Sequence, residues 1–75
     1  MRALIVRKKN KITRFLVELD TDELIEEVAV LVANGKSSEA VAIIIARGRI
    51  EKEISEGDAK KVKADIIIQE DGGAL

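Results

Sequence analysis

The 75-residue sequence contains no cysteine, histidine, proline, tryptophan or tyrosine. Without cysteine, disulfides, thiol nucleophiles and thiolate metal sites are excluded. Without histidine, the chain lacks the usual zinc ligand and the usual general base near neutral pH. Phe15 is the single aromatic residue, so any hydrophobic core must be built from aliphatic side chains.

The joint absence of five residue types is itself informative. Average usage would place about 4 prolines in a chain of this length. Such a composition is compatible with a computationally designed or engineered scaffold that has no biological partner. An unusual natural sequence is the alternative origin.

Charge is nearly balanced overall but unevenly distributed. The net charge of −1 argues against general attraction to nucleic acid or anionic membranes, so we expect neither membrane binding nor specific nucleic-acid binding. Residues 1–14 hold six basic side chains and no acid, whereas residues 18–27 hold six acids and no base. Acids are favourable at a helix N-terminus. The alternative interpretation is a pair of opposed charged faces that meet a partner.

The hydropathy pattern predicts one cytoplasmic domain. No run approaches the roughly 18 apolar residues of a membrane span, and charged residues recur after Val6, unlike a signal peptide. A domain of this size lies near the lower limit for folding without cross-links. We expect the folded domain to occupy residues 1–70 and a flexible, glycine-bearing tail to occupy residues 71–75.

The first segment, "RALIVRKKNKITRFLVEL", predicts a β-hairpin that turns at Lys9–Asn10. Alternate residues of its second strand form one apolar face (Thr13, Phe15, Val17, Leu19) and one mixed face (Ile12, Arg14, Leu16, Glu18). Because only one face is cleanly apolar, we expect the sheet to be covered on one side.

The next segment, "DTDELIEEVAVLVANG", predicts a helix. Asp20, Thr21 or Asp22 can cap its start, and Gly35 ends it. An apolar stripe recurs at helical spacing along it: Leu24, Val28, Leu31 and Val32. This stripe is expected to pack on the apolar face of the hairpin.

The segment Ala40–Ala46 is seven apolar residues without a break and is ambiguous. Its short length, its β-branched residues and the glycines on both sides favour a strand. Its alanines and the Ser38–Glu39 pair favour a helix. We predict a central strand at Val41–Ile45. An extended piece near Arg49–Glu51, a turn at Glu56–Asp58 and a last strand at about Ala64–Gln69 are expected to follow.

The sequence contains no complete catalytic or ligand-binding motif. "NGKS" at 34–37 resembles the end of a phosphate loop, but Val30 occupies the position where that motif needs a glycine. Ser37, Ser38 and Ser55 have no histidine to activate them, and the acids lack calcium-loop spacing. The sequence therefore predicts no catalytic residue, no metal site and no cofactor.

Two family resemblances carry different functions. "FLVELDTDEL" followed by "NGKSSEAV" resembles the strand, first helix, turn and second helix of ribbon-helix-helix repressors over residues 12–46. That resemblance implies a DNA-binding dimer. It requires a helix, not a strand, at residues 40–46.

The second resemblance covers nearly the whole chain. "EAVAIIIARGRI", "ISEGD" followed by "ADIII", and "GG" at 72–73 resemble the central strand, loop, last strand and terminal pair of ubiquitin-like β-grasp proteins, closest to the ThiS/MoaD sulfur carriers. It implies an adenylating enzyme as partner, with Gly72 and Gly73 as the site of covalent attachment. Ala74 and Leu75 follow here, so Gly73 has no free carboxylate.

We therefore predict an α+β protein with a ubiquitin-like β-grasp fold, in which one helix packs on one face of a mixed sheet. The expected function is that of a non-enzymatic carrier or modifier. The alternatives are a designed scaffold and a ribbon-helix-helix DNA-binding dimer.

Overall fold

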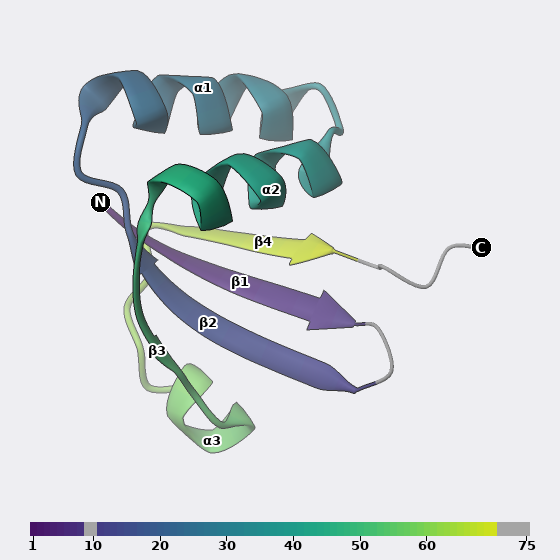
Figure 1. The fold of residues 1–75 in the computed structure, drawn as a ribbon. Helices are drawn as coiled ribbons and strands as arrows, with labels where there is room; N and C mark the ends of the chain where they lie inside the picture. Colours follow the sequence, from purple (N-terminus) through teal and green to yellow (C-terminus); the bar gives the residue numbers. More distant parts are fainter. Residues whose placement is uncertain (9–10, 71–75) are drawn as a thin grey trace.

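The computed structural model describes residues 1–8 and 11–70. Along this part of the chain the elements follow in the order β1 (Arg2–Lys8), β2 (Ile12–Glu18), α1 (Asp22–Ala33), α2 (Ser37–Arg47), β3 (Arg49–Glu53), α3 (Glu56–Ala59) and β4 (Ile66–Glu70) (Figure 1). The predicted tail at 71–75, with Gly72 and Gly73, lies outside the described residues.

The strands form one mixed sheet in the order β3-β2-β1-β4. The β1–β2 and β2–β3 pairs are antiparallel, whereas β4 runs parallel to β1, with Ala3 opposite Ile66 and Arg7 opposite Glu70. The α+β class and the mixed sheet are therefore confirmed. The structure also confirms the hairpin, the extended segment that begins at Arg49 and the last strand, although β4 begins two residues later than predicted.

Helix α1 follows its sequence signals closely. The Thr21 hydroxyl accepts a hydrogen bond from the Leu24 amide at 3.2 Å, which caps the first turn. Gly35, just beyond the helix, has a φ of 74°. Its amide donates to the Val32 carbonyl and the Lys36 amide donates to the Leu31 carbonyl, both in the last turn of α1. This is the glycine-terminated arrangement that a Gly after the last apolar residue predicts.

The predicted strand at Val41–Ile45 is wrong, because these residues lie within helix α2. At helical spacing Ala40, Val41 and Ile44 share one face, and all three are buried. That face packs against the sheet and α1, which together cover a segment too apolar for an exposed helix. The β-branched composition favours a strand only weakly, and tertiary packing overrides it. Two helices, rather than one, thus cover this face.

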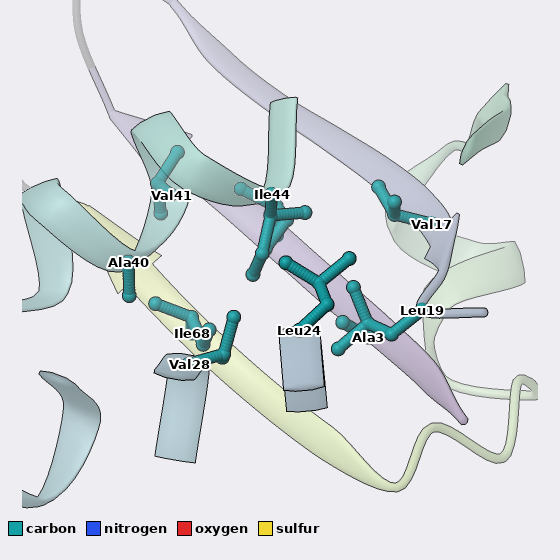
Figure 2. Packing of buried hydrophobic residues seen from close by; sticks show 10 residues of the cluster. Ala3, Val17, Leu19, Leu24, Val28, Ala40, Val41, Ile44 and Ile68 are labelled. Carbon is teal, nitrogen blue, oxygen red and sulfur yellow. The ribbon is translucent and has the colours of Figure 1, made fainter. Parts of the chain in front are cut away.

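The main core lies between this helix pair and the sheet (Figure 2). Leu24 and Val28 reach it from α1, and Ala40, Val41 and Ile44 from α2. The sheet side and the β2–α1 connection contribute the remaining buried residues: Ala3, Ile5, Val17, Leu19 and Ile68. As the composition requires, every buried side chain of this cluster is aliphatic.

The opposite face of the sheet is covered as well, which corrects the expectation of a one-sided sheet. Leu4 and Val6 from β1 form a second buried cluster with Ile54. Ala59, Val62 and Ala64, from α3 and the segment that follows it, pack against this cluster. Figure 1 shows α3 on the side of the sheet away from α1 and α2.

No helix in the described ranges is long and apolar enough to cross a membrane.

Candidate functional site

A shallow groove of about 550 Å³ runs along the outer side of the helix pair. Its lining combines acidic and aliphatic side chains: Glu23, Glu26, Glu27, Val30 and Leu31 from α1, and Ile43 from α2. An acidic rim beside an apolar floor on the surface suits a polypeptide ligand better than a small polar molecule.

The helical periodicity of α1 determines which of its residues face the core and which line the groove. Leu24 and Val28 point into the core. Glu23, Glu27 and Val30 recur at spacings of four and three residues, so they lie together along another side of the same helix. Val30 is 59% exposed, so its side chain presents apolar surface to solvent within the groove.

Helix α2 supplies the second wall. Ile43 precedes the buried Ile44 and is itself only partly buried, with its side chain against both core and groove. One turn further along, the Arg47 guanidinium bonds the Glu27 carboxylate at 2.7 Å and joins the two helices. This ion pair is about half exposed and contributes little to stability.

The groove has a negative charge, because the other two acids have no such partner among the residues that the structure describes. Within the part of the chain that the structure describes, neither Glu23 nor Glu26 has a basic group within ion-pair distance. Their carboxylates are exposed to solvent at the edge of the apolar floor. A cationic ligand group can approach both without displacing an existing ion pair.

The acidic run at 18–27 is divided by the fold instead of forming one face. Glu18 accepts a hydrogen bond from the Met1 ammonium at 2.6 Å, and Asp20 lies 3.5 Å from Arg49. The bond from the ammonium lowers the pKa of Glu18, and the bond to Glu18 raises the pKa of the Met1 amine. This pair holds the open ends of the β1–β2 hairpin together. From the acidic run, Glu23, Glu26 and Glu27 line the groove.

The other residues singled out from the sequence do not join this groove. Ser37 and Ser38 form the start of α2, where they line a separate depression with Gln69 and Glu70, and Ser55 caps α3. In the described ranges, no group of three acidic side chains is placed to hold a metal ion. Gly72 and Gly73 lie outside the described residues.

The strand-helix-helix order of the ribbon-helix-helix resemblance is present at β2, α1 and α2. However, β2 is hydrogen-bonded to β1 along one edge and to β3 along the other. Leu16 and Val17 are buried. A strand enclosed in this way is not free to enter a DNA groove as part of a two-stranded ribbon.

Comparison of the chain with protein-family models, with curated proteins and with solved structures gave no match. The groove was missed from sequence because its second wall exists only if residues 37–47 are helical. One signal could have found it: Val30, which lies off the predicted apolar stripe of α1.

Proposed function

We propose that this chain is a non-enzymatic protein-interaction domain that binds a basic amphipathic helix in the α1–α2 groove. The observation that carries the proposal is the exposed apolar floor at Val30, flanked by the solvent-exposed Glu23 and Glu26 carboxylates. An exposed apolar patch with a polar rim is typical of interaction sites.

Both features of the groove contribute to recognition in different ways. An amphipathic helix places apolar side chains every three or four residues, which matches a floor built from two neighbouring helices. Lysine or arginine beside those positions would meet Glu23 and Glu26. Exposed charges of this kind mainly accelerate association and orient the partner. Burial of Val30 and Ile43 would supply most of the affinity.

A synthetic helical peptide composed of leucine and lysine in an amphipathic pattern is a suitable probe. Titration followed by backbone NMR should shift the signals of Val30, Leu31 and Ile43 first. Val30→Ser should weaken binding about tenfold, because roughly 1.4 kcal/mol of apolar burial is lost. Val30 is exposed, so the fold should be unaffected.

Charge reversal separates this site from general attraction to an acidic surface. Glu23→Lys should weaken peptide binding and reduce its salt dependence. Glu53→Lys is the matched control, because Glu53 is an exposed acid on β3 that does not line the groove. If both reversals weaken binding equally, or if Val30→Ser has no effect, peptide affinity depends on the overall charge of the protein and the proposal fails.

A second candidate function is the carrier or modifier role of the β-grasp resemblance. Supporting it are a β-hairpin, a helix on one face and a last strand parallel to β1. Against it, the predicted central strand is helix α2, and β3 pairs with β2 at the far side of the sheet. In this role Gly72 and Gly73, shortly after β4, would be the attachment site.

Truncation tests the carrier role. A chain that ends at Gly73 should form an acyl-adenylate with an adenylating enzyme and ATP, detectable by mass spectrometry, whereas the 75-residue chain should not react. If neither form reacts, the carrier role is lost while the groove proposal stands. If the intact chain reacts at Leu75, the assignment to Gly73 is wrong.

A further inference from the structure

The two edges of the sheet differ in chemistry. Within the described residues, no strand pairs with the outer side of β3 or of β4. Edge β3 reads Arg-Ile-Glu-Lys-Glu and is exposed along its whole length. Charged edge strands of this kind resist pairing with another chain. Edge β4 reads Ile-Ile-Ile-Gln-Glu, so its first three positions carry no charge.

The charges that do flank β4 are already engaged within the chain. At its start, the Asp65 carboxylate accepts a hydrogen bond from the Arg2 amide at 2.9 Å. At its end, Glu70 is buried and pairs with Arg7 at 2.8 Å. The Glu70 charge is therefore neutralised within the chain, whereas Asp65 keeps its charge and is held in place by the Arg2 amide. Between them lies Ile67, which is 61% exposed on the face away from the helix pair.

We propose that the β4 edge pairs with the β4 edge of a second copy of this chain, antiparallel about a twofold axis at Ile67. In this register Ile67 faces its own counterpart, and Ile66 faces Ile68 of the second copy. Asp65 faces Gln69 and Glu70 faces Ala64, so no two like charges are opposed. A cross-strand arrangement of aliphatic pairs without charge repulsion is favourable.

The backbone is consistent with this register. The Asp65 amide donates to the Arg2 carbonyl at 2.9 Å, toward β1. Because backbone groups alternate in direction along a strand, those of Ile66 and Ile68 point to the open side. They can exchange hydrogen bonds with Ile68 and Ile66 of the second copy. Ile67 then sits at a non-hydrogen-bonded pair, where the two Cα atoms approach to about 4.5 Å.

The pairing of two five-residue strands is a small contact. It falls below the roughly 1,200 Å² that a standard stable interface buries. We therefore expect a monomer–dimer equilibrium that shifts toward dimer with concentration, rather than a permanent dimer. The dimer joins two sheets into one and leaves both α1–α2 grooves outside the strand contact.

Analytical ultracentrifugation over a range of concentrations tests the proposal on the intact chain. Ile67→Lys should weaken dimerisation at least about tenfold, because it sets two ammonium groups against each other. Ile50→Lys is the matched control: Ile50 is 47% exposed on β3 and should leave the equilibrium unchanged. Circular dichroism verifies that both variants fold.

Cysteine cross-linking tests the register, since the chain itself has no cysteine. Cα atoms at a non-hydrogen-bonded pair lie within the 4.4–6.8 Å range of disulfides. Ile67→Cys should thus form a disulfide-linked dimer under mild oxidation, whereas Ile50→Cys should not. A wild-type chain that stays monomeric at the highest concentration overturns the proposal and leaves this edge to a different occupant. Equal cross-linking at Ile50 also overturns it.

Discussion

Helices α1 and α2 lie side by side on the sheet but arise from different kinds of sequence. Helix α1 starts at a side-chain cap, has acids in its first turn and ends at a glycine with positive φ. Helix α2 starts at Lys36 without a side-chain cap, and β-branched residues dominate its apolar centre. The first was predicted and the second was not.

This difference shows where each helix obtains its stability. Local signals favour α1, since its cap and its charge pattern act within one or two turns. Helix α2 has favourable charges at Glu39 and Arg47 but no side-chain cap and a β-branched centre, so burial of its apolar face must favour the helical conformation. We therefore expect α2 to depend on tertiary packing more than α1 does, and three sets of substitutions can test this.

The largest expected effect comes from the buried face of α2. Ile44 is fully buried, so Ile44→Ala should lower the free energy of unfolding by roughly 2–5 kcal/mol. Ile45 is 38% exposed, and Ile45→Ala should change it by only about 0.5 kcal/mol. Urea denaturation measures both. A strand would instead bury Ile43 and Ile45 on a common face, so the reverse order would contradict the helix.

The ends of the two helices should respond differently to the same substitutions. A Cβ at Gly48, after α2, would lie 2.7 Å from the Ile44 carbonyl oxygen and 2.8 Å from Val17 Cγ1. Gly48→Ala should cost about 1–3 kcal/mol through this overlap. Gly35, after α1, has open space but a φ of 74°, so Gly35→Ala should cost roughly 1–2 kcal/mol.

Asparagine distinguishes the two causes, and thermal unfolding reads out the result. Gly35→Asn should be tolerated better than Gly35→Ala, because asparagine adopts positive φ more readily. Gly48→Asn should be at least as destabilising as Gly48→Ala, because the overlap remains. Gly57→Ala is the control without either problem, since its Cβ would meet nothing within 4 Å. A Gly48→Ala variant as stable as wild type would contradict the close approach.

The smallest expected effect concerns the starts of the helices. Thr21→Ala removes the hydroxyl that accepts from Leu24 and should cost about 1 kcal/mol, whereas Thr21→Ser should retain most of the stability. Ser37→Ala at the start of α2 should change stability by no more than about 0.5 kcal/mol. Chemical denaturation of the three variants measures this. Equal losses at Thr21 and Ser37 would show that both starts depend on caps.

The candidate groove could be predicted from sequence only in part. Once α1 is recognised as a helix, its periodicity predicts that Glu23, Glu27 and Val30 lie on one side of it. Ile43 does not, because a strand at 41–45 would have placed it within a sheet. The second cluster under the sheet was missed for a related reason: Val62 and Ala64 have no periodic pattern that indicates which face they cover.

Composition and local pattern by themselves determined the aliphatic core, the hairpin, α1 with its ends and the last strand. The aliphatic core follows from the residue types that are absent. The other features follow from patterns among residues close in sequence. Only the tertiary structure decided that Ala40–Ala46 is helical, which edge of the sheet β3 joins and that Ile67 remains exposed. Each of these is set by burial against segments distant in the chain, and an unbroken aliphatic run is compatible with either conformation until those segments meet it.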